Sequence, residues 1–259
     1  MRSALGNMQP ATRGIMIKAV IFDFGQTLVD SANGFRTAEK EAQDKLFANL
    51  GLTVREDFLA IYRRHRKEFH DRSNFSRNSL WQEVFYYYCV AVDSDLLVRW
   101  ETEYWETVKK HTTLFPEVSG VLAALRTRYE IALITNTQGQ KSTGTHRISL
   151  YPELENFFSV IIVAGEGGTP TKPDPQPFHQ CLEKLGISPS EAVYIGDDWR
   201  IDICGARDAG MHAIWLKHHA VQRNWPEIEN PGPVITNLEE LLDLEKLLPQ
   251  YQKEGTRHL

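Results

Sequence analysis

The sequence predicts an α/β protein: a doubly wound, Rossmann-like parallel sheet core with an inserted α-helical cap. Short apolar runs rich in β-branched residues recur along the chain and alternate with helical stretches, which is typical of parallel strands covered on both faces. One long stretch, residues 31–113, interrupts this alternation, because its apolar residues recur at helical spacing throughout. Together these observations predict a sheet core with a helical insertion after its first strand.

The first strand is expected from Ala19 to Phe22, a short apolar run that ends directly before Asp23. Later apolar runs predict strands near residues 131–135, 160–164, 192–196 and 212–216, separated by helices near 140–150, 174–186 and 201–210. Gly186 and Gly210 lie where helix C-caps belong. A short strand around residues 233–236 and a helical stretch over 238–248 complete the core.

The insertion is predicted to contain four helices. Three of them show apolar stripes, formed by Phe35, Ala38, Ala42, Leu46 and Leu50, by Phe58, Ile61, Tyr62 and Phe69, and by Leu97, Trp100, Tyr104 and Val108. We therefore expect residues 15–30 and 114–259 to form the Rossmann-like core and residues 31–113 to form the cap. Residues 1–14 are expected to be a disordered or loosely attached lead-in.

The composition indicates a soluble globular protein of the cytoplasm. Of 259 residues, 29 are basic and 34 are acidic, and the resulting net charge of −5 gives no reason to expect nucleic-acid binding. The three cysteines have no metal-ligand spacing and are expected to be reduced core thiols. No apolar run reaches the roughly 18 residues of a membrane span, so no membrane association is expected. Both a monomer and a homodimer remain open.

Polar groups follow four of the predicted strands. Asp23 follows the first strand, and Thr135 and Asn136 end the second; Lys172 lies in the loop after the third. The strand near residues 192–196 runs into an acidic group, formed by Asp197, Asp198 and Asp202. Because ligands of open α/β sheets bind at the carboxyl edge of the strands, we expect these side chains to form one site.

These residues match the motifs of a known family. The chain resembles the haloacid dehalogenase superfamily of hydrolases, most of whose members are magnesium-dependent phosphatases. The resemblance rests on four segments in order, namely Asp23-Phe24-Gly25-Gln26-Thr27, Thr135-Asn136, Lys172-Pro173-Asp174-Pro175 and Gly196-Asp197-Asp198-Trp199-Arg200-Ile201-Asp202. It extends from about Lys18 to about Leu242.

The resemblance implies a mechanism for removing phosphate from a small phosphorylated metabolite, such as a sugar phosphate. Asp23 would attack phosphorus to form an aspartyl phosphate, which water then hydrolyses. Thr135 would hydrogen-bond a phosphoryl oxygen with help from the Asn136 backbone, and Lys172 would neutralise charge on the phosphate and the nucleophile.

The resemblance also implies Mg²⁺ as the cofactor, because this ion prefers oxygen ligands from one or two carboxylates, water and substrate phosphate. Its ligands would be the carboxylates of Asp23 and Asp197 and the backbone carbonyl of Gly25. Asp198 and Asp202 are candidates for holding metal-bound water or Lys172 in place.

The chain departs from the family pattern at Gly25, where phosphatases of the family usually carry a second Asp as general acid and base. Such a group is typically worth ~10²–10⁴-fold in rate. Three compensations are open: a leaving group of low pKa, such as an anomeric or acyl phosphate, a proton donor from the insertion, or a water oriented by Gln26. The alternative for Gln26 is that it only caps the loop. The candidates for the proton donor are His65, His70 and Asp71.

Other functions also remain open. A catalytically degenerate protein could bind a phosphorylated ligand or a protein partner without turnover. Phosphonate hydrolysis would require a lysine from the insertion, for which Lys40 and Lys45 are the candidates, and carbon–halogen cleavage is disfavoured because Gly196-Asp197 is present. In every case the insertion should close over the site as a mobile cap. Two alternatives are open for its basic stretch: Arg66 or Arg72 faces a second anionic group of the substrate, or both lie on a solvated helix surface.

Overall fold

The computed structural model describes residues 16–137 and 146–248. Its main sheet has six strands in the order β5-β4-β1-β6-β7-β8, and each neighbouring pair is parallel. The strands are β1 (Ala19–Phe22), β4 (Glu130–Asn136), β5 (Val160–Ala164), β6 (Ala192–Gly196), β7 (His212–Leu216) and β8 (Val234–Ile235). The predicted parallel sheet is therefore confirmed.

The central strand β1 is buried on both faces. All four of its side chains are inaccessible to solvent. Val20 and Phe22 belong to the hydrophobic core on one side of the sheet, and Ala19 and Ile21 belong to the core on the other side. This explains why the strand is apolar throughout and shows no polar alternation.

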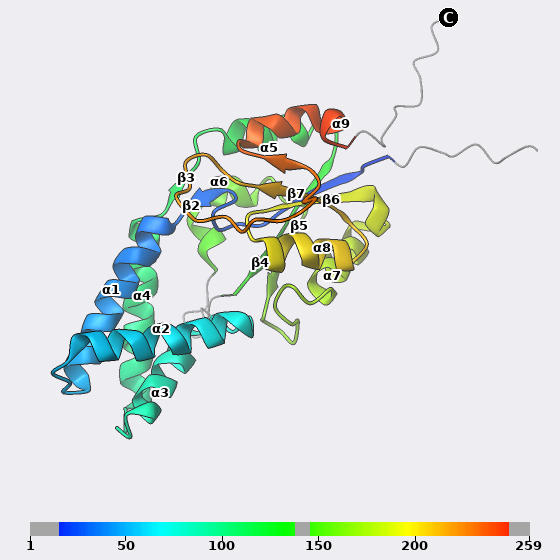
Figure 1. Ribbon diagram of the computed structural model, residues 1–259. Helices are drawn as coiled ribbons and strands as arrows, with labels where there is room; N and C mark the ends of the chain where they lie inside the picture. The colour runs from blue at the N-terminus through cyan, green and yellow to red at the C-terminus, as the bar shows by residue number, and fades with distance from the viewer. Residues whose placement is uncertain (1–15, 138–145, 249–259) are drawn as a thin grey trace, which may run out of the picture.

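Helices cover both faces of the sheet, so that the sheet part has three layers (Figure 1). Helix α5 (Val118–Leu125), the short helix α6 (Pro152–Glu155) and the C-terminal helix α9 (Leu244–Leu247) contribute to one core. Helices α7 (Gln176–Leu185) and α8 (Gly205–Asp208) contribute to the other core. Gly186 ends α7 with a left-handed φ of 68°, as a helix C-cap glycine should.

Four helices form a separate body to one side of the sheet (Figure 1). They are α1 (Ala32–Asn49), α2 (Arg55–Asp71), α3 (Arg77–Tyr87) and α4 (Ser94–Lys110), and we call residues 32–110 the helical segment. The predicted stripes meet in a third hydrophobic core, around Phe58, Trp81 and Trp105. The four predicted helices are thus confirmed, whereas the division of the chain into two domains at residues 30 and 114 stays a prediction.

Two short strands connect the helical segment to the sheet part. Strand β2 (Val29–Asp30) precedes α1, strand β3 (Thr113–Leu114) follows α4, and the two strands pair in antiparallel fashion. We call this pair of strands the stem. Next to it, α1 and α4 pack so closely that a Cβ added to Gly34 would lie 2.5 Å from the carbonyl oxygen of Val108. The helical segment is therefore held close to the end of β1.

Some local expectations differ from the structure. The helix expected near residues 140–150 lies partly outside the described residues, and Arg147–Leu150 form a 3₁₀ turn. The helix expected over 201–210 begins as a π-helical turn, Trp199–Cys204, before α8. Cys181 is buried as predicted, but Cys89 is exposed after the end of α3, so it is not a core thiol.

The expected lead-in, residues 1–14, lies outside the described residues. Within the described part of the chain, no helix combines the length and the apolar character needed to cross a membrane.

Candidate active site

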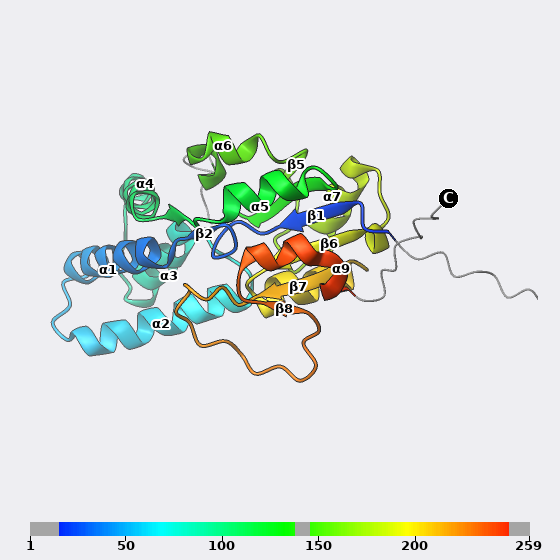
Figure 2. The ribbon, with the colours of Figure 1, turned by 90° about the horizontal axis from the view of Figure 1, so that it is seen from above.

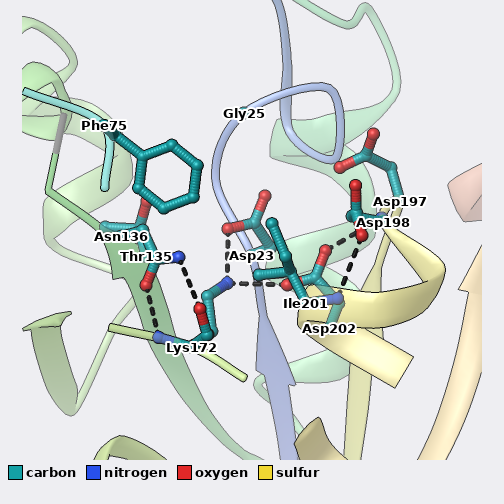
Figure 3. A pocket seen from close by; sticks show the side chains of 10 residues that line it. All are labelled: Asp23, Gly25, Phe75, Thr135, Asn136, Lys172, Asp197, Asp198, Ile201 and Asp202. Carbon is teal, nitrogen blue, oxygen red and sulfur yellow. Dashed lines mark hydrogen bonds and ion pairs between the residues drawn. The ribbon is translucent and has the colours of Figure 1, made fainter. Parts of the chain in front are cut away.

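A cavity of about 150 Å³ lies at the carboxyl ends of β1, β4 and β6. Figure 3 shows the side chains around it. Its lining consists of Asp23, Gly25, Phe75, Thr135, Asn136, Lys172, Asp197, Asp198, Ile201 and Asp202. All eight residues predicted as site residues from the sequence therefore meet at one cavity, although their catalytic roles remain predictions.

Lys172 lies at the base of this cavity and is fully buried. Its Nζ contacts Asp23 Oδ1 at 2.8 Å and Asp202 Oδ1 at 2.7 Å. It also lies 3.0 Å from the carbonyl oxygen of Ile134 and 2.7 Å from the hydroxyl of Tyr194. Burial alone would lower the pKa of Lys172, but the carboxylates of Asp202 and Asp23 outweigh it and raise the pKa above its usual value. Lys172 is thus a cation at neutral pH.

The backbone of Lys172 is fixed by Asn136 at the end of β4. The Asn136 side chain accepts a hydrogen bond from the Lys172 amide at 2.8 Å and donates one to its carbonyl oxygen at 3.2 Å. The family resemblance predicts a role for the Asn136 backbone, and the Asn136 side chain has this second, positioning role. Thr135, which precedes it, is buried and lines the cavity beside Lys172.

Three carboxylates come together opposite the lysine. One oxygen from each of Asp23, Asp197 and Asp202 lies within 4.8 Å of the others. Burial and the charge of Asp202 raise the pKa of Asp197 well above its usual value. Burial likewise raises the pKa of Asp202 to about 7, although Lys172 lowers it. Oxygen ligands and concentrated negative charge fit a hard divalent cation such as Mg²⁺.

Both carboxylate oxygens of Asp202 have partners within the protein. Its Oδ1 binds Lys172, and its Oδ2 accepts a hydrogen bond from the backbone amide of Asp198 at 3.0 Å. Asp198 in turn caps the π-helical turn by accepting from the amide of Ile201 at 2.9 Å. A Cβ on Gly196 would lie 2.4 Å from Asp202 Cβ, so only glycine leaves room for this arrangement. These contacts fit a supporting role for Asp198 and Asp202.

The loop after Asp23 shapes the remaining wall. Gly25 lines the cavity and offers no side chain at the position where the family usually has its general acid. Gln26 has a positive φ of 60°, and its side chain accepts a hydrogen bond from the Ser31 amide at 2.7 Å. Gln26 therefore caps the loop and does not orient a water in the cavity.

One residue of the helical segment lines the cavity and is not among the residues predicted from the sequence. Phe75, in the connection between α2 and α3, points its ring into the cavity near Asn136 (Figure 3). Contacts with residues next to the site hold this connection. Arg200 donates to the carbonyl oxygen of His70 at 3.0 Å and to Ser73 Oγ at 3.3 Å, and Thr171 donates to the Ser73 carbonyl oxygen at 3.1 Å.

The proton donors suggested for the insertion do not line the cavity. His65 is buried in the helical segment with its ring against Tyr87, and Asp71 is exposed and pairs with Lys67. His70 lies near the cavity but meets Arg200 through its backbone carbonyl. None of the three is among the residues that line the cavity.

The basic residues of the insertion that the sequence suggested for the site do not line the cavity either. Arg66 pairs with Glu39 at 3.7 Å, and Lys45 pairs with Glu103 in the helical segment. Arg72 and Lys40 are exposed and do not line the cavity. Among the described residues, Lys172 is therefore the only basic residue in the cavity lining, which removes the geometric support for a lysine-based phosphonate hydrolase.

Two further polar residues lie near the site and are not among the site residues predicted from the sequence. Tyr194 lies within the apolar run of β6, and its hydroxyl donates to the carbonyl oxygen of Ile134 at 2.9 Å while accepting from Lys172. Arg223 comes from the long connection between β7 and β8, and its Nη1 lies 2.5 Å from Asp197 Oδ2. A hydroxyl inside a buried strand could have identified Tyr194, whereas no pattern distinguishes Arg223.

The sequence is similar to those of known phosphatases over most of its length. N-acylneuraminate-9-phosphatase of Rattus norvegicus is 28% identical over 208 residues, which cover 77% of this chain and 82% of that protein. Glyceraldehyde 3-phosphate phosphatase of Methanothermobacter thermautotrophicus is 27% identical over 243 residues, 90% of this chain and 100% of that protein.

A solved structure is similar along most of its length. The 2-haloacid dehalogenase from Pseudomonas syringae pv. Tomato DC3000 superposes with a TM-score of 0.62 at 27% identity, covering 92% of this chain and 100% of that one. The family model of haloacid dehalogenase-like hydrolases matches residues 17–210, which include every predicted site residue. The chain therefore belongs to the haloacid dehalogenase-like hydrolase family.

Proposed function

We propose that this chain is a Mg²⁺-dependent phosphatase that acts on small phosphorylated metabolites through an aspartyl phosphate on Asp23. One observation carries the proposal: the Asp23 carboxylate lies between a fully buried lysine and a group of carboxylate oxygens that suits a divalent cation. Relatives over most of the chain bear the names of phosphatases, which supports the same chemistry.

In the proposed reaction an oxygen of Asp23 attacks phosphorus and the bond from phosphorus to the substrate oxygen breaks. The substrate leaves as an oxyanion, which takes up a proton from water. Water then attacks the aspartyl phosphate and releases inorganic phosphate, which regenerates the Asp23 carboxylate. Lys172 holds Asp23 in place and offsets the charge that develops on the transferred phosphoryl group. Thr135 would donate a hydrogen bond to a phosphoryl oxygen.

Mg²⁺, held by Asp23, Asp197 and the carbonyl of Gly25, would supply positive charge that lets an anionic nucleophile approach a phosphate dianion. Asp202 and Asp198 would keep Lys172 and the surrounding loop fixed. Such a cation would also favour the ionised form of these buried carboxylates, whose mutual repulsion otherwise opposes ionisation.

The structure narrows the ways in which the absence of an acid at Gly25 can be compensated. Gln26 is committed to Ser31, and His65, His70 and Asp71 do not line the cavity. Within the described part of the chain, the route that is left is a leaving group that departs with little protonation, as in a sugar 1-phosphate. The proposed substrate class is therefore phosphate esters of acidic hydroxyl groups, anomeric sugar phosphates among them.

Phe75 supports the same substrate class. It gives the cavity an aromatic wall, and no cation from the helical segment lines the cavity to hold a second anionic group. Aromatic rings commonly pack against the apolar face of a ligand ring while a few polar groups fix its orientation. We propose that the leaving group contacts Phe75. The protein is further proposed to work in the cytoplasm as a monomer or homodimer.

The test is phosphate release from a panel of monoesters, including sugar 1-phosphates, sugar 6-phosphates and an activated aryl phosphate, with Mg²⁺ or with EDTA. Wild type, Asp23→Asn and Gly25→Asp are compared, and Asp71→Asn serves as a control because Asp71 is exposed outside the cavity. We expect metal-dependent turnover that disappears in Asp23→Asn and persists in Asp71→Asn. Gly25→Asp should gain activity mainly on esters with poor leaving groups.

If wild type hydrolyses no ester of the panel under any condition, the proposed phosphatase activity is wrong. A non-catalytic protein that binds phosphorylated ligands would then be the better interpretation, and Gly25 is the residue that favours it. Turnover that is equal in Mg²⁺ and EDTA would contradict the metal requirement alone.

A further inference from the structure

We propose that Arg223 is an internal counterion of the metal site: it occupies Asp197 when no divalent cation is bound and must leave when one binds. This inference rests on the proposed Mg²⁺-dependent function. It assigns to a residue outside the family motifs a direct effect on metal loading.

The contacts of Arg223 are made with the acidic residues that follow β6. Its Nη1 lies 2.5 Å from Asp197 Oδ2 and its Nη2 lies 3.6 Å from Asp198 Oδ2. The Arg223 side chain is 35% exposed, whereas the Asp197 side chain is 9% exposed. One guanidinium therefore reaches from the surface to a buried carboxylate and bridges it to a second one.

Four carboxylates around the cavity pair with two basic side chains. Lys172 pairs with Asp23 and Asp202, and Arg223 pairs with Asp197 and Asp198. Among the described residues, no other side chain forms an ion pair with these four carboxylates. Arg223 thus neutralises the pair that Lys172 does not reach, and buried carboxylates without such a partner are strongly unfavourable.

A divalent cation and Arg223 compete for the same carboxylate. Mg²⁺ binds carboxylate oxygens at about 2.0–2.1 Å. A guanidinium that remains at 2.5 Å from Asp197 would place its charge within a few ångströms of the ion, and like charges at that separation repel strongly in a partly buried site. Displacement of Arg223 from Asp197 moves its positive charge away from the ion and so removes this repulsion. The Asp197 carboxylate does not lose its counterion, because the divalent cation replaces the guanidinium.

The segment that carries Arg223 can move without the loss of regular structure. It connects β7 to β8 and forms a long excursion at the edge of the sheet (Figure 2). Within the described chain, residues 222–232 make no backbone-to-backbone hydrogen bonds. Side chains hold the segment instead: the Arg223 guanidinium lies 4.7 Å from the Trp225 ring centre, and Arg207 donates to the carbonyl oxygen of Pro231.

The first test is calorimetric titration of metal-free protein with Mg²⁺ in the absence of substrate. Arg223→Gln should bind Mg²⁺ about two- to fivefold more tightly than wild type, the range expected for loss of a partly exposed ion pair. Arg223→Lys retains the charge and should bind close to the wild-type affinity. Arg207→Gln is the matched control, because Arg207 anchors the far end of the same segment through Pro231 and stacks on Trp199; its affinity should stay at the wild-type value.

The second test uses tryptophan emission, because displacement of Arg223 uncovers the Trp225 ring. Mg²⁺ should change the emission of wild type, and this change should be lost in Trp225→Phe and in Arg223→Gln. Unchanged or weaker Mg²⁺ binding in Arg223→Gln overturns the inference, as does tighter binding in Arg207→Gln of the same size. These outcomes leave the proposed function intact, which fails only if wild type shows no Mg²⁺-dependent phosphate release.

Discussion

Lys172 shows how one residue can organise the whole cavity. Its ammonium group contacts two carboxylates, a backbone carbonyl and a hydroxyl, all within 3.0 Å, and has no access to solvent. A lysine is tolerated at such depth because its charge is fully paired and hydrogen-bonded. The same contacts aim Asp23 into the cavity, so stability and the proposed chemistry depend on the same atoms.

We expect Lys172→Met to abolish measurable turnover and to lower the free energy of unfolding by about 3 kcal/mol, because it leaves Asp23 and Asp202 buried without their cation. Urea unfolding and phosphate release measure the two effects. Lys184→Met is the control, since Lys184 is exposed on α7. A variant with wild-type stability would show that the buried pair contributes nothing to folding.

The acidic residues predict a pH dependence of metal binding. Burial raises the pKa of Asp202 to about 7, and the pKa of Asp197 is also raised. The Asp202 carboxyl group is therefore largely protonated below about pH 7 in the metal-free protein, and the raised pKa of Asp197 acts in the same direction, so that protons compete with Mg²⁺. We expect the Mg²⁺ affinity to rise by up to about tenfold per pH unit between pH 6 and 7 and to level off by pH 8.

Calorimetric titrations at pH 6, 7 and 8 measure this dependence. Asp202→Asn removes one of the protonating groups and should flatten it. An affinity for Mg²⁺ that is constant from pH 6 to pH 8 would contradict the raised pKa values.

At the scale of elements, the connection between α2 and α3 determines what meets the leaving group. Ser73 has a left-handed φ of 53°, a conformation that usually belongs to glycine after a helix. Its hydroxyl and its carbonyl oxygen both contact the sheet part, through Arg200 and Thr171. The strained backbone is thus associated with an interface that holds Phe75 over the cavity.

Phe75→Ala should reduce kcat/KM for sugar phosphates by about tenfold, because the apolar wall against the leaving group is lost. Turnover of acetyl phosphate, which has a small leaving group, should change much less. Steady-state kinetics on both substrates measures the difference, with Tyr86→Ala as the control because Tyr86 is exposed on α3. Equal losses on the two substrates would indicate that Phe75 acts on the cavity as a whole.

The packing of α1 against α4 next to the stem depends on a glycine. Gly34→Ala places a methyl group against the Val108 carbonyl oxygen, which forces the helices apart and should destabilise the protein by about 1–3 kcal/mol. Gly120→Ala is the matched control, because nothing lies within 4 Å of its added methyl group; it should stabilise α5 by roughly 0.5–1 kcal/mol. Urea unfolding compares the two, and equal stability of both variants would contradict close packing at the stem.

At the scale of the whole molecule, the sequence predicts the positions of those site residues that follow or end a strand of the sheet. Asp23, Thr135, Lys172 and Asp197 could be predicted to meet because each follows or ends a recognisable buried strand, and parallel strands bring their carboxyl ends to one edge. The four helices could be predicted because their apolar stripes must face a common core.

Residues held by irregular segments could not be predicted in this way. Phe75 and Arg223 lie in connections, where neither helical nor strand periodicity fixes the direction of a side chain. The π-helical turn after Asp198 also has no signature, because it depends on the tertiary contacts of Asp198 and Asp202.

The pairing of β2 with β3 has a consequence for how the helical segment is joined to the sheet. Because they lie side by side, the chain leaves the sheet part and re-enters it one strand spacing apart, about 5 Å. A tight hairpin turn could bridge that gap. The stretch between the two strands can therefore differ in length without a change in the strand order of the sheet, and Asp23, Thr135, Lys172 and Asp197, the residues proposed for phosphate chemistry, all lie outside it.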